Sequence, residues 1–351
     1  MIRVLVAEDS RSASELLVHI LESEKGISVV DTAVDGCEAV EKARALKPDV
    51  ITMDIHMPRM DGLQATRAIM SSSRPVPIVI ISASMDPDEV GNAFVALEAG
   101  AIALCEKPVS IGHPDFEKIS KRIVRQVRML SEVKVVRRWA ARTGTPLTSP
   151  RAGEGPGGVR ALLRLVAIGA STGGPPVLHA VLAGLPRGFP VPILIVQHIA
   201  AGFLLGLVDW LTAASGFHVE IGADGQTALP ACAYMAPDGA HMEVDRNGRI
   251  RLRKGDPVNG MCPSVSVLFR SVAAAYGESA AGILLTGMGR DGAEELKVMR
   301  DRGAVTIAQD RESSVIHGMP GEAIRLGAAR HVLPPDQISR FLREAVEERH
   351  D

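Results

Sequence analysis

Short apolar segments of strand length alternate with segments of helical periodicity through the first third of the chain. Five apolar runs rich in β-branched residues recur there, namely IRVLVAED, ISVVDTAV, DVITMDIHMP, PIVIISAS and AIALCEKP. Between them, stretches such as residues 13–22 and 37–46 carry apolar residues at helical spacing. This alternation favours a parallel sheet with helices on both faces. The pattern ends near residue 130, after an apolar helical stripe formed by Phe116, Ile119, Ile123, Val127 and Leu130.

A second series of strand-length apolar runs begins at Leu162. The runs LLRLVAIGAS, VPILIVQHI, AGILLTGMG and GAVTIAQD end in glycine, polar or charged residues, and helical patterns follow them. Between the second and third runs, the segment ACAYMAPDGAHMEVDRNGRIRLRK has the character of a β-hairpin, with RNGR as a strong turn signal. The predicted fold class is therefore α/β, with two doubly wound parallel-sheet domains. The first has five strands, and the second is larger and carries some antiparallel decoration.

The two series are separated by a segment of different composition. RTGTPLTSPRAGEGPGGVR is rich in Gly, Pro, Ser and Thr and has no apolar period, which is typical of a flexible linker. We divide the chain into a first domain (1–125), a helical and flexible basic linker (126–160) and a second domain (161–351). Residues 117–164 contain twelve Lys or Arg and three Glu. This basic excess predicts either a solvated helix face with its linker or a docking surface for an acidic partner.

Composition narrows the function classes. The formal net charge of −2 on 351 residues gives no overall field that attracts nucleic acid or membrane surfaces. No apolar run reaches the length of about 18 residues that a membrane span needs, and acidic residues occur at position 8, too early for a signal peptide. We expect a cytoplasmic protein without nucleic-acid binding or membrane insertion. The four cysteines lack C-x-x-C spacing and are expected to be small hydrophobes in a reducing compartment: Cys37, Cys105, Cys232 and Cys262.

Polar residues follow four of the five predicted strands of the first domain. Glu8 and Asp9 end the first strand, Asp54 the third, Ser82 the fourth, and Lys107 the fifth. The carboxyl ends of parallel strands form the ligand-binding edge of such a sheet, so these side chains are expected to converge. Three convergent carboxylates repel one another unless a cation such as Mg²⁺ lies among them. Asp54 could then attack a phosphoryl donor as a nucleophile, while the metal and Lys107 neutralise the developing charge.

These residues lie in motifs that resemble a known family. DIHMPRMDG and EKP are similar to sequences of the receiver domain of bacterial response regulators, and the resemblance covers residues 1 to about 125. It implies phosphorylation of Asp54, a metal site formed by the three carboxylates, and contacts from the serine and the lysine to the phosphoryl group. Two positions depart from the family pattern. Glu8 stands where Asp is more common, and Leu104 stands where many receivers have an aromatic switch residue.

The first predicted strand of the second domain ends in the sequence VAIGASTGGPP. Gly169, Ser171 and Gly173 match G-x-S-x-G, a strand–serine–helix turn in which small neighbours expose the hydroxyl group. Glycine-rich turns of this kind also bind phosphate at helix N-termini. The motif alone therefore leaves three interpretations open: a nucleophile, a phosphate-binding loop or an ordinary flexible loop.

A serine nucleophile requires a base and an acid that orients the base. His198 ends the strand VPILIVQHI, and Asp291 follows the strand in GILLTGMGRDG, so both are expected at the same sheet edge as Ser171. The order Ser, His, Asp differs from the Ser, Asp, His order of α/β-hydrolases. His241 and His317 are two further candidates for the base, and Asp310 is a further candidate for the acid.

Several motifs of the second half together resemble one family. GASTGG, QHI, TGMGRDG, PSVSVLFRS and AQDRESSVIHGMPG are similar to the C-terminal domain of bacterial chemotaxis protein-glutamate methylesterases, the CheB family. The resemblance implies a triad of Ser171, His198 and Asp291, with backbone oxyanion donors near Thr172 and Met288. The chain departs from the family in reading QHIA for QHMP, GRD for GND and PSVSV for PSVDV. These departures affect the substrate surface and the choice of receptor.

The combined resemblance implies a phosphorylation-activated enzyme that hydrolyses glutamyl methyl esters and deamidates glutamine. Its substrates would be the cytoplasmic domains of methylated chemoreceptors, and a chemotaxis histidine kinase would supply the phosphoryl group. Mg²⁺ is expected in the receiver, and no cofactor is expected for the esterase. The unphosphorylated receiver would cover the active site until Asp54 is phosphorylated. Three alternatives are a transcription regulator, which the strand–helix alternation after the linker disfavours, a binding protein without catalysis, and an esterase of a chemosensory system unrelated to swimming.

Overall fold

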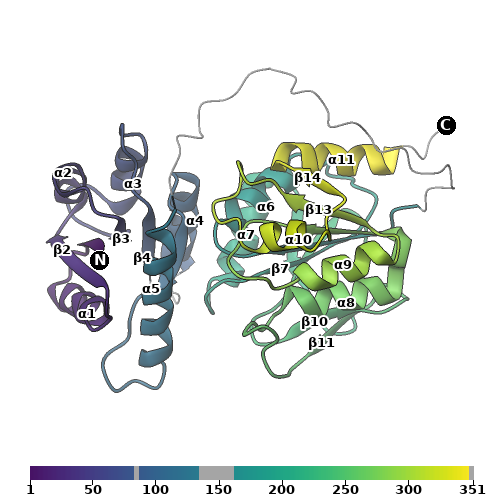
Figure 1. Ribbon diagram of the computed structural model, residues 1–351, viewed down its shortest axis with the longest axis horizontal. Helices are drawn as coiled ribbons and strands as arrows, with labels where there is room; N and C mark the ends of the chain where they lie inside the picture. Colours follow the sequence, from purple (N-terminus) through teal and green to yellow (C-terminus); the bar gives the residue numbers. More distant parts are fainter. Residues whose placement is uncertain (83–86, 134–161, 348–351) are drawn as a thin grey trace.

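The computed structural model describes residues 1–82, 87–133 and 162–347 and places two α/β domains next to each other (Figure 1). Most of the segment assigned to the linker, residues 134–160, lies outside the described residues. The proposed boundary at residue 125 falls within helix α5 (Phe116–Leu130). None of the described helices combines the length and the apolar character needed to cross a membrane.

The first domain contains a five-stranded parallel sheet in the order β2-β1-β3-β4-β5. Its strands are β1 (Ile2–Ala7), β2 (Ile27–Ala33), β3 (Val50–Asp54), β4 (Ile78–Ser82) and β5 (Ala103–Glu106). Its helices are α1 (Arg11–Glu22), α2 (Gly36–Leu46), α3 (Gly62–Met70), α4 (Pro87–Glu98) and α5. Alternate residues of a strand point to opposite faces, so in β1 Leu5 packs with α2, α3 and α4, whereas Val4 packs with α1 and α5. The predicted doubly wound sheet is confirmed.

The second domain contains a seven-stranded sheet in the order β14-β13-β12-β6-β7-β9-β8, and every neighbouring pair is parallel. Its strands are β6 (Leu165–Ala170), β7 (Ile193–Gln197), β8 (His218–Ile221), β9 (Cys232–Met235), β12 (Ala280–Leu284), β13 (Val305–Gln309) and β14 (His331–Leu333). The predicted hairpin exists as β10 (His241–Val244) and β11 (Ile250–Arg253), which pair antiparallel. The start of that predicted segment, Cys232–Met235, instead joins the parallel sheet.

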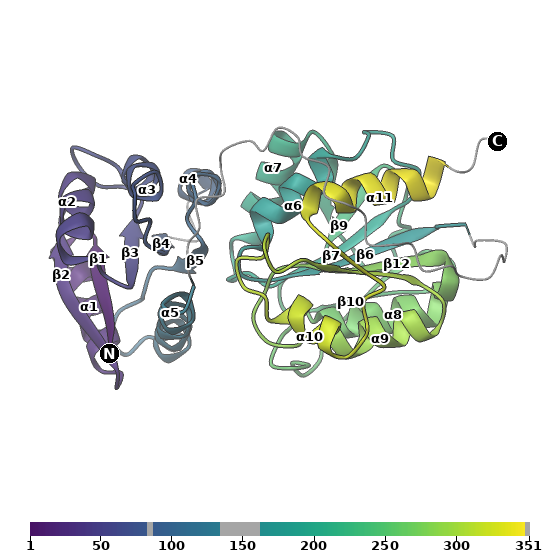
Figure 2. The same cartoon turned by 45° about the horizontal axis from the view of Figure 1, so that its top comes forward.

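Helices cover both faces of the second sheet (Figure 2). One face packs on α6 (Gly174–Ala183), α7 (Leu204–Ser215) and α11 (Pro335–Glu347). The other packs on α8 (Val265–Tyr276), α9 (Ala293–Asp301) and α10 (Met319–Arg325), with a short 3₁₀ turn at Gly277–Ser279. Both domains thus leave the carboxyl ends of their strands open to loops, which is where ligands bind in such sheets.

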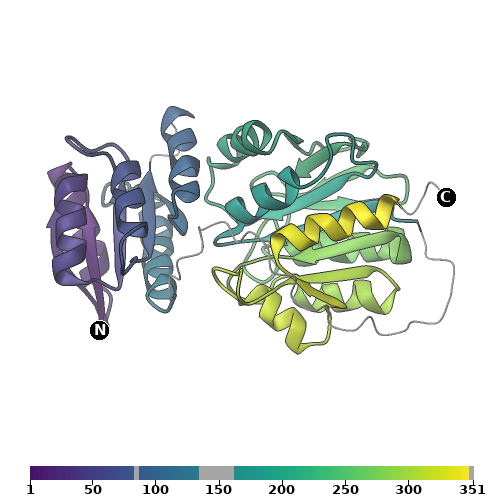
Figure 3. The same ribbon diagram turned by 90° about the horizontal axis from the view of Figure 1, so that it is seen from above.

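Helices α4 and α5 lie on the side of the first domain that faces the second domain (Figures 1 and 3). Phe94 of α4 stacks on Trp210 of α7 with ring centroids 5.6 Å apart. His179 of α6 also contacts the Trp210 ring, at 5.4 Å, and its Nδ1 lies 3.9 Å from a carboxylate oxygen of Glu98. The two domains therefore share a packed contact that includes an aromatic pair.

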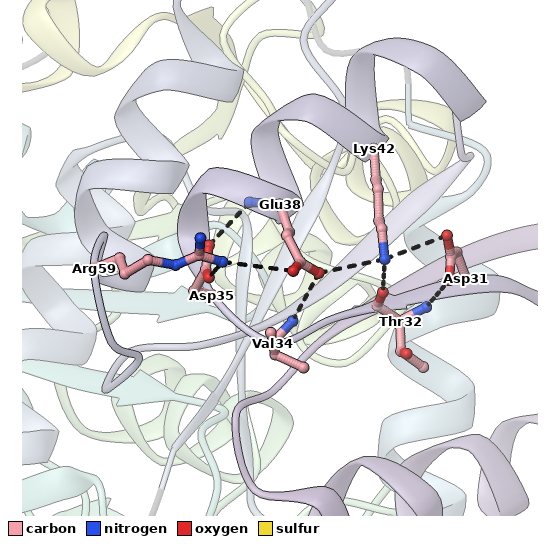
Figure 4. A network of polar contacts seen from close by, with 7 residues as sticks. All are labelled: Asp31, Thr32, Val34, Asp35, Glu38, Lys42 and Arg59. Carbon is pink, nitrogen blue, oxygen red and sulfur yellow. Dashed lines mark hydrogen bonds and ion pairs between the residues drawn. The ribbon is translucent and has the colours of Figure 1, made fainter.

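A polar network fastens the loop after β3 to the start of α2 (Figure 4). Asp35 is buried and caps α2 by accepting a hydrogen bond of 3.0 Å from the backbone N–H of Glu38. Arg59, which lies in the loop and has a φ of 63°, forms ion pairs with the carboxylates of Asp35 and Glu38. Lys42 continues the network, with Nζ 3.4 Å from oxygens of Glu38 and Asp31. This network fixes the loop that lies immediately after the last residue of β3.

Candidate active site and phosphoacceptor site

The structure brings together the acidic residues and the lysine predicted at the sheet edge of the first domain. Carboxylate oxygens of Glu8, Asp9 and Asp54 lie within 4.8 Å of one another. Nζ of Lys107 lies 2.8 Å from Oδ2 of Asp54 and 3.4 Å from Oε2 of Glu8. Ser82 is fully buried at the end of β4, and its carbonyl accepts a 2.9 Å hydrogen bond from the backbone N–H of Lys107. All five side chains therefore come from the carboxyl edge of one sheet.

The electrostatics of this cluster fit a hard cation. Burial and the neighbouring charge of Asp54 raise the pKa of Glu8 from 4.5 to about 7. Burial also raises the pKa of Asp54, against the opposing effect of Lys107. Oε2 of Glu8 is buried and accepts no hydrogen bond from the described residues. The three carboxylates repel one another, and one of their oxygens has no hydrogen-bond partner among the described residues. Mg²⁺ prefers oxygen ligands, so it would both offset the repulsion and bind that oxygen.

The turn that carries Ser171 requires both glycines of the G-x-S-x-G motif. A Cβ atom at Gly169 would lie 2.3 Å from the side chain of Val265. Gly173 has a φ of 77°, and a Cβ there would approach Val315 to 2.7 Å. These close approaches place Ser171 at the end of β6, directly before α6, with 8% of its surface exposed.

In the same turn, backbone N–H groups that a phosphate-binding loop would direct at its ligand already donate to protein carbonyls. The N–H of Ser171 donates to the carbonyl of Thr286 at 3.0 Å, and the N–H of Gly174 donates to the carbonyl of Ser171 at 2.8 Å. Phosphate-binding turns instead direct such N–H groups at the ligand. The geometry favours the interpretation of Ser171 as a nucleophile over that of a phosphate-binding loop.

Neighbouring strands bring His198 next to Ser171. Ala170 of β6 pairs with Gln197 of β7, so the residues that follow the two strands emerge side by side. The backbone N–H of His198 donates to the carbonyl of Ala170 at 2.9 Å. Ser171 and His198 line one cavity of about 220 Å³.

His198 and Asp291 form a buried pair. Nε2 of His198 lies 3.0 Å from Oδ2 of Asp291, and the two side chains are 8% and 4% exposed. Nδ1 of His198 is buried and has no hydrogen-bond partner among the described residues. Because a carboxylate accepts from Nε2, that nitrogen carries the proton, and Nδ1 is left as the basic nitrogen of the neutral ring.

Several donors hold Asp291 in its ionised form. Besides His198, its carboxylate accepts hydrogen bonds of 2.7–3.2 Å from four groups: the Val265 N–H, the Ser266 N–H, the Ser264 hydroxyl and the Asn259 amide. Burial acts to raise the pKa of Asp291, but the interaction with His198 and the Asn259 and Ser264 bonds outweigh it and hold the pKa well below its usual range. Three of the donors belong to the start of α8, whose dipole also favours a negative charge.

Gln197 was not singled out from the sequence, yet it joins the two loops of the site. Its Nε2 donates to the carbonyl oxygens of Ser171 and His198, at 2.8 and 2.9 Å, and its side chain is buried. Ser264, Ser266 and Asn259 were also given no role. Gln197 and His198 together form a polar pair at the end of a buried strand, and that pairing was the available sequence signal.

The alternative base and acid candidates lie elsewhere. His241 is fully buried in β10, with Nε2 3.1 Å from the carbonyl of Asp256. Nδ1 of His317 lies 3.2 Å from the hydroxyl of Ser314, and Asp310 accepts a 3.1 Å hydrogen bond from the backbone N–H of Ser313. The residues that line the cavity of Ser171 and His198 include none of these three candidates. Thr172 and Met288, the predicted oxyanion positions, do line it.

Comparison with known proteins identifies both halves of the chain. The CheB methylesterase family matches residues 166–342, and the response regulator receiver domain family matches residues 4–113. The chain belongs to the CheB methylesterase family. The predicted family, the α/β fold class and the enzyme class are thereby confirmed.

Full-length relatives support this assignment to the CheB methylesterase family. The protein-glutamate methylesterase/protein-glutamine glutaminase of Nitrosospira multiformis is 52% identical over 99% of this chain and 98% of its own length. A relative of the same name from Syntrophus aciditrophicus is 52% identical over 97% of both chains. The solved CheB methylesterase catalytic domain of Thermotoga maritima is 36% identical, covers 52% of this chain and 98% of its own, and has a TM-score of 0.50.

In this CheB-family chain the receiver domain forms one wall of the cavity that contains Ser171 and His198. The receiver residues of that wall come from α4, from β5 and its approach, and from α5: Leu97, Ile102, Ala103, Leu104, Arg122, Arg125, Gln126 and Met129. The guanidinium of Arg125 lies 3.9 Å from Sδ of Met288. The receiver therefore lies directly over the serine and the histidine, and Leu104, at the position where many receivers carry an aromatic residue, is part of the covering wall.

Proposed function

We propose that this chain is a phosphorylation-activated enzyme of the cytoplasm that removes methyl esters from glutamyl side chains of chemoreceptors. It also deamidates glutamine on the same cytoplasmic receptor domains and so contributes to sensory adaptation. The observation that carries the proposal is the pairing of His198 with Asp291 beside Ser171, in a cavity covered by a receiver domain. The relatives that share nearly the full length carry the corresponding name.

Ester hydrolysis follows from the arrangement of the three side chains. Oγ of Ser171 attacks the ester carbonyl, and Nδ1 of His198, the nitrogen without a partner, takes the hydroxyl proton. Asp291 accepts the hydrogen bond from Nε2 and stabilises the imidazolium. His198 then returns the proton to the leaving methoxide, and methanol departs. Water attacks the acyl-enzyme with His198 again as base, which releases the glutamate carboxylate and restores Ser171; glutamine follows the same steps with ammonia as leaving group.

Charge on the tetrahedral intermediate requires donors near the serine. Thr172 and Met288 line the same cavity as Ser171, and their backbone N–H groups are the donors that we propose for the oxyanion. Each such donor contributes about 3 kcal/mol of transition-state stabilisation in related acyl-transfer sites.

We further propose that phosphorylation of Asp54 by a chemotaxis histidine kinase opens the cavity. Glu8, Asp9 and Asp54 would hold Mg²⁺, which when bound neutralises charge on the transferring phosphoryl group. The ammonium of Lys107, now 2.8 Å from Asp54, would contact the phosphoryl oxygens, as would the hydroxyl of Ser82. Lys107 directly follows β5, and the same strand carries two residues of the cavity wall, Ala103 and Leu104. A shift of this segment therefore reaches the interface between the domains without an aromatic switch residue.

Mg²⁺ is expected to bind the receiver about tenfold more tightly at pH 8 than at pH 6, because the proton on Glu8 competes with the metal. With a pKa of about 7, the carboxyl group of Glu8 is mostly protonated at the lower pH and mostly ionised at the higher one. Isothermal titration calorimetry of the full chain at both pH values measures the difference. A Glu8→Gln variant should bind more weakly and lose the pH dependence; equal wild-type affinities at both pH values would contradict the assignment.

The test of gating is methanol release from methylated receptor membranes, with and without a small phosphodonor and Mg²⁺. We expect the wild-type rate to rise about tenfold or more, since about 1.4 kcal/mol of differential stability between covered and open forms suffices. Asp54→Asn should keep the basal rate and lose the stimulation. The matched control is Asp31→Asn, because the exposed Asp31 carboxylate pairs with Lys42 and lies outside the acidic cluster. Equal wild-type rates with and without the donor would overturn the gating proposal.

A further inference from the structure

A second group of metal-ligating side chains lies on the edge of the methylesterase sheet. His218 and Glu220 belong to the edge strand β8, and Cys232 begins the neighbouring strand β9. His218 and Cys232 are direct partners in the parallel register, and Glu220 lies two residues further along β8. Because side chains alternate between faces, all three point to the same side of the sheet. One ligand atom of each lies within 4.8 Å of the other two.

The spacing fits a small tetrahedral ion. Nε2 of His218 lies 3.6 Å from Oε2 of Glu220. Two ligands of a tetrahedral Zn²⁺ with bonds of about 2.0–2.2 Å lie about 3.4 Å apart, so little movement is needed to admit the ion. Gln226 donates a 2.6 Å hydrogen bond to the other carboxylate oxygen, Oε1, which orients the carboxylate of Glu220. Such outer contacts are typical of metal ligands.

The chemistry and the position separate this group from the two sites described above. Imidazole, thiolate and carboxylate together favour Zn²⁺ over Mg²⁺, which prefers oxygen ligands only. His218 and Cys232 are the first residues of their strands, at the amino edge of the sheet, whereas Ser171 and His198 follow the carboxyl ends of theirs. The group is therefore at the opposite edge of the sheet from the esterase cavity.

We infer that His218, Glu220 and Cys232 bind one Zn²⁺ ion, with water as the fourth ligand. On binding, the Cys232 thiol releases its proton to solvent, and the ion connects the edge strand β8 to β9. His218 is 62% exposed and gives access from solvent, whereas the thiol lies in the protein interior. An edge strand of four residues gains the most from such a connection, because it is bonded on one side only.

The state of the thiol disfavours redox chemistry at this group. Burial raises the pKa of Cys232 to about 11, so in the absence of metal the group is a neutral thiol at pH 7. Neutral thiols are poor nucleophiles and oxidise slowly. A metal ion replaces the proton, and Zn²⁺ affinity should therefore increase with pH.

The test uses the full chain with saturating Mg²⁺, which occupies the oxygen cluster of the receiver. Titration with Co²⁺ should give one equivalent of binding, with tetrahedral absorption bands and a sulfur-to-cobalt charge-transfer band, and Zn²⁺ should abolish both. Cys232→Ser should lose the charge-transfer band, and His218→Ala should weaken Co²⁺ and Zn²⁺ binding at least about tenfold. A hundredfold excess of Zn²⁺ over its Kd should also raise the unfolding temperature by about 5 °C.

His218→Ala keeps the inference testable if Cys232→Ser fails to fold, because the histidine is largely exposed. Two matched controls, Cys37→Ser and His113→Ala, alter an exposed cysteine and a half-exposed histidine outside the group and should leave the bands unchanged. The absence of a charge-transfer band in the wild type would overturn the inference. So would a band of wild-type intensity and affinity in His218→Ala or in Cys232→Ser.

Discussion

Replacing Ser171 with alanine is expected to lower methanol release from methylated receptor membranes by at least about 10⁵-fold, because the attacking oxygen is removed. Two nearby hydroxyl groups are already engaged in hydrogen bonds: the Ser264 hydroxyl donates to Asp291 at 2.8 Å, and the Thr286 hydroxyl is bonded to the carbonyl of Thr172 at 3.0 Å. Alanine retains the Cβ atom, which packs against the backbone of Gly287. The variant should therefore fold normally and still bind receptor membranes, as co-sedimentation would show.

A second Ser, His and Asp grouping in the same domain provides the matched control for Ser171. Ser314 lies 3.2 Å from Nδ1 of His317, and its hydroxyl donates to the backbone carbonyl of Asp310. Ser314→Ala should retain a rate near that of the wild type. A Ser171→Ala variant with more than about one hundredth of the wild-type rate would exclude Ser171 as the nucleophile, since alanine supplies no substitute oxygen.

The sequence located these chemical groups because a parallel sheet converts a linear pattern into a spatial one. Each polar residue at the end of an apolar run reaches the same edge, so Glu8, Asp54 and Lys107 converge although 99 residues separate the first from the last. The same reasoning predicted that His198 and Asp291 would share an edge, and they lie 3.0 Å apart.

The elements that the sequence did not reveal have weak or ambiguous patterns. Strands β8 and β14 contain four and three residues and lie at the sheet edges, so their half-exposed positions give little periodicity. Strand β9 was assigned to a hairpin because a short apolar run does not indicate whether its partner is parallel or antiparallel. The hydrogen bonds to Asp291 could not be predicted from the sequence either, because every helix start has free backbone N–H groups, whatever its residues. The contact of Phe94 with Trp210 joins two domains, and periodicity within one domain does not predict it.

Replacing Asp291 with asparagine is expected to reduce kcat by about 10⁴-fold, the effect known for the buried aspartate of a Ser-His-Asp triad. An asparagine amide can offer an N–H group to Nε2 of His198, which would move the ring proton to Nδ1, the nitrogen that we propose as the base. Such a histidine has no lone pair available to accept the hydroxyl proton. Rates measured with receptor membranes should therefore fall, while receptor binding should change little.

The stability of the Asp291→Asn variant gives an independent readout. Because the folded-state pKa of Asp291 lies below its usual range, its contribution to stability is fully present above pH 3.8 and is lost as the pH falls through the folded-state value. The asparagine variant should be less stable at neutral pH by about 1–3 kcal/mol. One of the buried groups that donate to the Asp291 carboxylate would then face the N–H group of the asparagine amide and lose its acceptor. This difference should shrink in acid. The control is Asp310→Asn, which alters the alternative acid. An Asp291→Asn variant within tenfold of the wild-type kcat, or an equal loss in Asp310→Asn, would assign the orienting carboxylate elsewhere.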